Sequence, residues 1–217
     1  WLECPADPAK SEDWAIHPIG AIPTSHRIRW ADLELNGSKL KCLLNLPIVG
    51  IGAKAPMYSG SVSFVTYRPS PFRPDAAPLW AALEVDDTLG MAHGLRIVQW
   101  DDDASEEILT ASFDGVHLFD FDPPAQKFTK RQLGKGHAGK RPEQGSSEVA
   151  LGALASQEMR FIAAIEPWHG NEVVVYEVGT PTTMGEERVV IDSALKDGHA
   201  LACFDIEKDG NDEIVAG

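Results

Sequence analysis

Cysteine is scarce in this sequence. The 217 residues include three cysteines, Cys4, Cys42 and Cys203, and no two of them form a CxxC pair. An odd number at such wide spacings indicates neither a disulfide framework nor a zinc ribbon. Cys42 and Cys203 lie inside apolar segments, where we expect them to be small buried hydrophobic residues.

Positive charge and long apolar runs are also scarce. Nineteen Lys and Arg residues face 33 Asp and Glu residues, which gives a net charge of −14 at pH 7. A nucleic-acid surface needs a basic face, so we expect no nucleic-acid partner. No apolar run approaches the roughly 20 residues of a membrane helix, so we expect no membrane association. The chain starts without Met, and we interpret it as a piece of a longer protein whose compartment the sequence does not indicate.

Helical periodicity is missing as well. No segment keeps a helical pattern over twelve residues, whereas short segments rich in Val, Ile, Phe, Tyr and Trp are bounded by Gly, Pro, Asp and Asn. This pattern predicts three groups of four strands: 26–32, 40–46, 61–67 and 79–85; 94–100, 107–113, 116–121 and 127–133; 148–154, 159–165, 172–178 and 188–192. Shorter strand pieces are predicted at 1–3, 14–17, 199–204 and 213–216.

A strand–turn–strand unit recurs along the chain. It is clearest in residues 200–216, where an apolar strand enters an acidic turn with Gly210 and a second apolar strand leaves it. Weaker copies follow Trp30 and Trp100. Units anchored on their first strands repeat every 50 to 67 residues or so, about the size of a propeller blade with its loops.

The predicted fold is therefore all-β, a partial ring of a β-propeller with four-stranded antiparallel blades. The predicted boundaries are a partial blade at 1–20, blades at about 21–88, 89–136 and 137–195, and a partial blade at 196–217. A partial ring leaves sheet faces uncovered, so we expect the remainder of the same propeller to be a partner. The oligomeric state stays open.

The first strand of a propeller blade lines the central channel. In this chain these strands begin at His26, His93, Glu148 and His199, so three blades offer an imidazole at one ring position and the fourth a carboxylate. Imidazole suits zinc and similar ions. We therefore predict His93, His199 and Glu148 as ligands of a divalent metal, with His169 close by. The alternative is that these are hydrogen-bonded structural residues.

Loops that open on the same face supply candidate sugar contacts. Trp168 lies in the Glu166–Asn171 loop, and its ring could stack on a sugar, although tryptophan is more often core. We predict Trp168, Asn171 and Arg141 as substrate-binding residues.

The last acidic turn offers hard oxygen ligands. Asp205, Glu207, Asp209 and Glu213 alternate there, which predicts calcium or magnesium binding. The alternative is a charged turn that uses Asp and Gly for backbone reasons. The turns after Asp32 and Asp101 lack a full ligand set.

Several stretches resemble known families. The 205–217 unit resembles the FG-GAP or VCBS repeat of β-propellers. Residues 22–32 (IPTSHRIRWAD), 166–176 (EPWHGNEVVVY) and the terminal unit, with Trp1-Leu2-Glu3 and Asp114-Gly115, resemble the propeller of the fungal aldos-2-ulose dehydratases, also called 1,5-anhydro-D-fructose dehydratases. The resemblance implies a carbon–oxygen lyase that dehydrates a keto-sugar such as 1,5-anhydrofructose or an aldos-2-ulose, with a divalent metal ion. The cupin-like domains of that family have no counterpart here.

The resemblance further implies a catalytic centre at His26 and Arg27. Dehydration beside a ketone needs a base of near-neutral pKa, which His26 supplies, and positive charge at the enolate, which Arg27 or a metal supplies. His169, or alternatively His93, is predicted to protonate the departing hydroxyl. Two alternatives stay open: a non-catalytic propeller that binds protein or glycan, and a polysaccharide lyase with Lys54, Lys140 and Arg141 as candidate basic residues.

Overall fold

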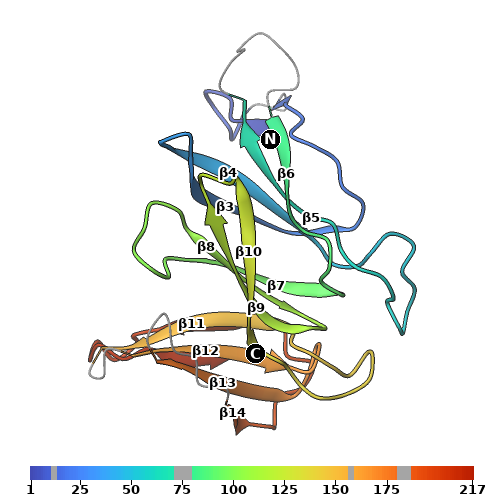
Figure 1. The fold of residues 1–217 in the computed structure, drawn as a ribbon, viewed down its shortest axis with the longest axis vertical. Helices are drawn as coiled ribbons and strands as arrows, with labels where there is room; N and C mark the ends of the chain where they lie inside the picture. The colour runs from blue at the N-terminus through green and yellow to red at the C-terminus, as the bar shows by residue number, and fades with distance from the viewer. Residues whose placement is uncertain (11–13, 71–79, 156–158, 180–186) are drawn as a thin grey trace.

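The architecture is a stack of antiparallel sheets. A computed structural model describes residues 1–10, 14–70, 80–155, 159–179 and 187–217, and no α-helix occurs among them. Three four-stranded sheets follow one another along the long axis of the molecule (Figure 1), and a two-stranded sheet pairs the shortest strands near each end of the chain. No helix in the described part is long and apolar enough to cross a membrane.

Each sheet is a meander of consecutive strands. The first contains β3 (Ser25–Leu35), β4 (Ser38–Pro47), β5 (Phe64–Pro69) and β6 (Trp80–Asp86). The second contains β7 (Ala92–Val98), β8 (Glu107–Ser112), β9 (Gly115–Asp122) and β10 (Lys127–Gly134). The third contains β11 (Glu148–Leu154), β12 (Met159–Glu166), β13 (Glu172–Gly179) and β14 (Arg188–Asp192). The two-stranded sheets pair β1 (Leu2–Glu3) with β2 (Ala15–Ile16), and β15 (Leu201–Phe204) with β16 (Glu213–Ala216).

The predicted all-β, partial-propeller fold is confirmed. Every predicted strand is present, with its ends shifted by at most three residues. The first strands of successive sheets lie beside one another, β7 next to both β3 and β11, and β15 next to β11. This places them on the inside of the arc, as in a propeller. The exact limits of the blades stay predictions.

Hairpin turns and cross-sheet packing specify this arrangement. Asn36 and Gly37 both have positive φ, 53° and 73°, which is the two-residue turn that connects twisted antiparallel strands with least strain. Between the first and second sheets, the rings of Phe64 and Phe119 meet edge to face at 5.8 Å. Between the second and third sheets, buried Leu109 and Ile162 belong to one apolar cluster. Apolar burial between sheets is the main stabilising contribution of such a fold.

Apolar side chains remain exposed on the end sheets. Trp30 on β3 is 47% exposed, Ile191 on β14 is 52% exposed and Phe204 on β15 is 48% exposed. These are positions that a further blade could cover. The partnership with the remainder of the ring stays a prediction.

His117 gives the fold a testable pH dependence. The ring lies on β9, 6% exposed, and burial and the nearby Lys130 hold its pKa below the ordinary value of 6.5. As the pH falls below 6.5, the unfolded chain takes up a proton at this residue before the folded chain does, so stability falls. We expect His117→Gln to reduce the loss of unfolding free energy between pH 7.5 and 5.5, by at most about 1.4 kcal/mol. Urea titrations at the two pH values measure this, and an equal loss in both proteins would contradict it.

Candidate functional site

Four histidines from four parts of the chain meet at the inner edge of the sheets. His26 lies on β3, His93 on β7, His169 in the turn between β12 and β13, and His199 just before β15. The ring of His93 lies 4.8 Å from that of His26, 4.9 Å from that of His169 and 4.6 Å from that of His199, between centroids. One ring nitrogen from each of His93, His169 and His199 lies within 4.8 Å of the other two. The structure therefore brings together the histidines that the sequence placed at one ring position, and adds His169.

Contacts of Nδ1 fix the orientation of the His93 ring. Its Nδ1 lies 3.0 Å from Glu148 Oε1 and 3.2 Å from the carbonyl oxygen of Ser147, which are both hydrogen-bond acceptors. A ring proton on Nδ1 can be shared with these two acceptors, and that tautomer leaves a lone pair on Nε2. Nε2 lies 3.4 Å from Nε2 of His169. With 1% of the residue exposed, His93 is a buried imidazole whose Nε2 points toward that of His169.

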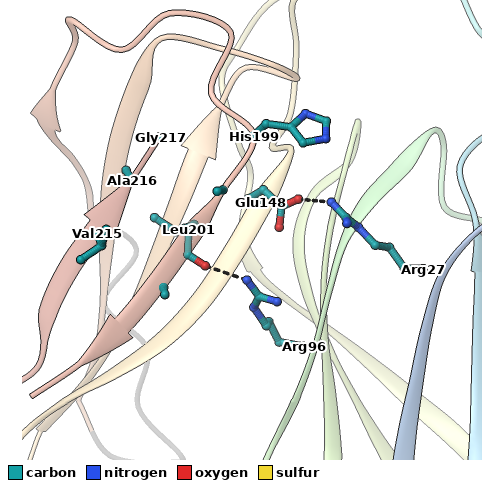
Figure 2. A pocket seen from close by; sticks show the side chains of 10 residues that line it. Arg27, Arg96, Glu148, His199, Leu201, Val215, Ala216 and Gly217 are labelled. Atoms are coloured by element: carbon teal, nitrogen blue, oxygen red, sulfur yellow. Dashed lines mark hydrogen bonds and ion pairs between the residues drawn. The ribbon is translucent and has the colours of Figure 1, made fainter. Parts of the chain in front are cut away.

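Glu148 and Arg27 form the support for His93. Burial would raise the pKa of Glu148, but the hydrogen bond from His93 and the charge of Arg27 outweigh it and hold that pKa below its usual value. Arg27 pairs with Glu148 through Nη2 and donates from Nε to the carbonyl oxygen of His93 at 2.9 Å. Figure 2 shows this ion pair with the His199 ring beside it. The structure thus places Glu148 behind His93 and gives Arg27 a contact that positions His93.

Close approach of the inner strands makes this support possible. A Cβ added to Gly94 would lie 2.8 Å from the Cβ of Ala111 and 3.0 Å from the carbonyl oxygen of Ser147. Both distances are shorter than ordinary van der Waals contact. Glycine beside His93 therefore lets β11 approach β7 closely enough for Glu148 to reach the imidazole.

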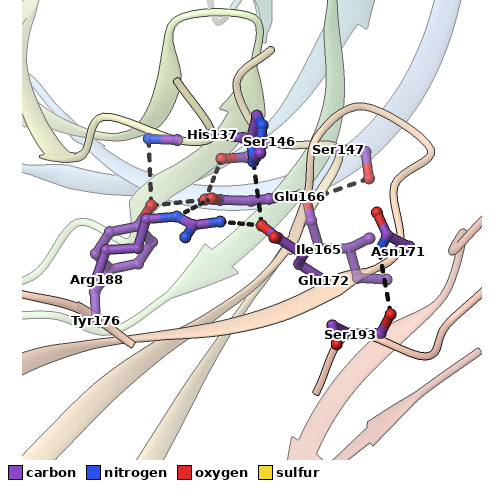
Figure 3. Close-up of polar contacts among 11 residues, drawn as sticks. His137, Ser146, Ser147, Ile165, Glu166, Asn171, Glu172, Tyr176, Arg188 and Ser193 are labelled. Carbon is purple, nitrogen blue, oxygen red and sulfur yellow. Dashed lines mark hydrogen bonds and ion pairs between the residues drawn. The ribbon is translucent and has the colours of Figure 1, made fainter. Parts of the chain in front are cut away.

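The turn that carries His169 is anchored by a buried carboxylate. Glu166 is fully buried, and its Oε1 accepts hydrogen bonds from Ser146 Oγ at 2.8 Å and Tyr176 Oη at 2.6 Å. Its Oε2 accepts from Arg188 Nε at 2.7 Å. Figure 3 shows these side chains gathered around Glu166. Because Ser146 also precedes β11, Glu166 connects the backbone around Glu148 with the backbone around His169.

A second carboxylate extends this anchor. Glu172 pairs with Arg188 Nη2 and lies 3.1 Å from Nδ1 of His137. Burial would raise the pKa of Glu172, but these two partners outweigh it, and the pKa lies below its usual value. Sequence reasoning assigned no role to Glu166, Tyr176, Glu172 or Arg188. Glu166, Tyr176 and Glu172 lie within the 166–176 stretch that resembles the dehydratase propellers. That resemblance was the only sequence signal that could have pointed to them.

The three residues predicted to bind substrate have other partners. Trp168 stacks on His169, with centroids 4.3 Å apart, and meets the edges of Tyr58 and Phe113. Asn171 donates from Nδ2 to the carbonyl oxygen of Ser193 at 3.1 Å. Arg141 donates to the carbonyl oxygen of Tyr58 at 3.3 Å, and its guanidinium lies 5.1 Å from the ring centre of Phe113. One face of Trp168 is thus taken by His169, and the substrate-binding roles stay predictions.

Two pockets border the histidines. One, with a volume of about 380 Å³, is lined by Arg27, Glu148 and His199 among others (Figure 2). The other, of about 580 Å³, is lined by Trp168, His169 and Asn171 among others. Each volume is within the range of small-molecule sites. A small ligand can therefore reach the cluster from either side.

Two histidines of this cluster, His169 and His26, have pKa values below the ordinary value. Partial burial and the neighbouring His93 and His199 lower the pKa of His169 to about 4. Burial, followed by the neighbouring His93 and Arg27, also lowers the pKa of His26. A neutral imidazole is the form that acts as a base or as a metal ligand.

The cluster fits a zinc-type ion. Imidazole nitrogens bind zinc at about 2.0–2.1 Å, so two ligands of a tetrahedral ion lie about 3.3 Å apart. The Nε2 atoms of His93 and His169 are 3.4 Å apart. A carboxylate on the second nitrogen, as Glu148 provides for His93, is typical of histidine ligands. Three imidazoles would leave the fourth position of a tetrahedral ion open.

The acidic turn at residues 205–213 has a different arrangement. The carboxylate of Asp205 accepts from the backbone N–H groups of Asp209 at 3.0 Å and Gly210 at 2.9 Å, and Glu213 accepts from that of Ile206 at 2.7 Å. Within the described residues, the acidic side chains whose oxygens converge belong to another turn, Asp101, Asp103 and Glu107. The structure thus does not bring Asp205, Glu207, Asp209 and Glu213 into one ligand set.

Comparison with known proteins identifies the family of this chain. The family model for the β-propeller domain of aldos-2-ulose dehydratase matches residues 1–178. Aldos-2-ulose dehydratase of Phanerodontia chrysosporium is 26% identical over 233 residues, an alignment that covers 99% of this chain and 25% of that protein. The chain thus spans about a quarter of the length of this relative.

Proposed function

Because this chain belongs to the family of aldos-2-ulose dehydratase β-propeller domains, we propose that it carries the dehydration site of a carbon–oxygen lyase acting on a keto-sugar. The expected substrate is 1,5-anhydrofructose or an aldos-2-ulose. The observation that carries the proposal is the convergence of His93, His169 and His199, with the ring of His26 4.8 Å from that of His93. The net charge of −14 favours this reading over a polysaccharide lyase, which would need basic residues to neutralise a uronate.

In this proposal His93, His169 and His199 hold one divalent metal ion, with zinc expected. When bound, the ion supplies positive charge to the carbonyl oxygen as the neighbouring C–H bond is broken. His169 is therefore reassigned from proton donor to ligand. Glu148 and Arg27 become positioning residues, because both contact His93 on the side away from the other histidines.

His26 is the proposed base. Its side chain is exposed beside the cluster, and its lowered pKa keeps the imidazole neutral at neutral pH. The ring takes the proton from the carbon next to the carbonyl, and the electron pair of that C–H bond forms the carbon–carbon double bond of the enone. The hydroxyl on the adjacent carbon leaves as water, and the proton it needs can come from the imidazolium that His26 has become.

The test of this function uses the full-length protein, because the relative is about four times as long as this chain. We expect incubation with 1,5-anhydrofructose to produce the ultraviolet absorbance of a conjugated enone. Prior treatment with a chelator should abolish the product, and added Zn²⁺ should restore it. Absence of product from the metal-loaded protein, with either 1,5-anhydrofructose or an aldos-2-ulose, would contradict the proposed reaction.

The role of Glu148 gives a separate prediction. Glu148→Gln keeps the shape of the side chain but removes the charge that orients His93, so we expect zinc affinity to fall by about 10- to 100-fold. Calorimetric titration of chelator-treated protein with Zn²⁺ measures this. Glu177→Gln is the matched control, because Glu177 is exposed on β13. Equal affinities for the Glu148 variant and the control would show that Glu148 does not support a metal ligand.

A further inference from the structure

Three carboxylates converge in the turn between β7 and β8. One oxygen from each of Asp101, Asp103 and Glu107 lies within 4.8 Å of the other two. The turn is at the opposite end of β7 from His93, so it is separate from the histidine cluster. Asp101 and Asp103 are exposed, whereas Glu107 is 1% exposed.

Glu107 has an unsatisfied oxygen. One of its oxygens, Oε2, accepts a hydrogen bond from the backbone N–H of Trp100. The other, Oε1, is buried and has no hydrogen-bond partner. A buried carboxylate oxygen without a partner is costly, so it points to a proton or a cation that completes the site.

The surrounding side chains indicate that the missing partner of Glu107 Oε1 is a cation rather than another side chain. Among the ion pairs of the described residues, none involves Asp101, Asp103 or Glu107. The acidic residue Asp32 of the first sheet differs, because it lies within β3 and pairs with Lys39 and Lys41 on β4.

We propose that this turn binds one hard divalent cation, with Ca²⁺ expected, through Asp101, Asp103 and Glu107. Calcium binds oxygen at about 2.3–2.6 Å, so ligand oxygens up to roughly 4.8 Å apart can share one ion. Magnesium binds at about 2.0–2.1 Å and limits that separation to roughly 4.2 Å. One buried and two exposed carboxylates leave the outer positions to water, as is common at calcium sites.

The location gives the ion a structural role. Arg160 on β12 donates from Nη1 to the carbonyl oxygen of Trp100 at 2.6 Å, so the turn is bound to the third sheet. On its other side, the backbone N–H of Glu106 donates to the carbonyl oxygen of Asp32 on β3 at 2.8 Å. A cation held at residues 101–107 therefore fixes the segment that joins three sheets, and stabilises the native state by mass action.

The test compares variants of the full-length protein after removal of metals with a chelator. Calorimetry and thermal unfolding are measured with Ca²⁺ alone, with Mg²⁺ alone and without metal. We expect Ca²⁺ to raise the unfolding temperature, and the Asp101→Asn/Asp103→Asn double variant to bind one Ca²⁺ fewer than the parent. The matched control, Asp205→Asn/Asp209→Asn, should keep the full number.

Three outcomes would overturn the proposal. The first is the absence of any calcium-dependent heat or stabilisation. The second is loss of the ion in the control but not in the Asp101→Asn/Asp103→Asn variant, which would place the site at residues 205–213. The third is a Glu107→Gln variant as stable as the parent in the presence of Ca²⁺, which would mean that the carboxyl simply carries a proton. If Glu107→Gln does not fold, the number of Ca²⁺ ions bound by the Asp101→Asn/Asp103→Asn variant tests the proposal instead. None of these results depends on turnover of the keto-sugar, so this proposal and the proposed function fail separately.

Discussion

Replacing His26 by glutamine should lower turnover of the keto-sugar by about 10²- to 10⁴-fold, the usual contribution of a general base. Glutamine has no group that accepts a proton at neutral pH, and it retains a side chain of similar reach. Zinc affinity should stay unchanged, because His26 lies beside the three converging nitrogens and is not one of them. Enone formation and calorimetric zinc titration, both on the full-length protein, measure the two quantities.

His17→Gln is the matched control for His26→Gln. His17 is stacked on Trp1 at 4.0 Å and lies 2.8 Å from Glu3 Oε2, and it is not one of the clustered histidines, so its loss should leave turnover intact. Parental turnover in the His26 variant would remove His26 from the base role while leaving the enzyme class in place. A parallel loss of zinc binding would instead make His26 a ligand.

Replacing Glu166 by alanine should reduce the free energy of unfolding by about 3–5 kcal/mol, the cost of removing one partner of a buried ion pair. The substitution leaves Arg188 without one of its two carboxylates and leaves the hydroxyls of Ser146 and Tyr176 without an acceptor. Urea unfolding measures the change.

We expect Tyr176→Phe, which removes one hydroxyl and keeps the ring, to lower the free energy of unfolding by about 1–3 kcal/mol.

Glu166 also has an expected effect at the histidines. If it positions the turn of His169, the alanine variant should lose zinc affinity under conditions in which it is still folded. Glu177→Ala, at an exposed position on β13, controls for loss of a carboxylate from the same sheet. A free energy of unfolding within about 0.5 kcal/mol of the parent, the usual range for a surface position, would rule out the anchoring role of Glu166.

The strands could be predicted from the sequence because each is a short run of β-branched and aromatic residues between turn residues. The ring position of His26, His93 and His199 was also predictable, since each lies at or just before the first strand of its unit. The small shifts at strand ends have local causes. For example, β15 starts at Leu201 because the backbone N–H groups of His199 and Ala200 both donate to the carbonyl oxygen of Gly217.

Roles that depend on contacts between sheets could not be predicted in this way. Arg27 follows His26 in sequence and was assigned to catalysis with it, but β3 has an irregular register between Ser25 and Arg27, so the sequence pattern does not show where these side chains point. The guanidinium of Arg27 reaches the carbonyl oxygen of His93 and the carboxylate of Glu148 in the next two sheets. The Asp101 turn was set aside for its incomplete motif. Its distinguishing feature is the burial of Glu107, which a motif does not encode.

The three proposed histidine ligands lie on different sheets and turns, and this affects when the metal can bind during folding. His93, His169 and His199 are separated by 76 and 30 positions in the sequence, and a different sheet or turn carries each. Contacts between such distant positions form late in folding, after local hairpins, because closing long loops costs entropy. During refolding, metal binding should therefore occur after β-structure has formed. A metal-sensitive dye that competes for the ion would measure when the ion binds, and hence when one blade packs against the next.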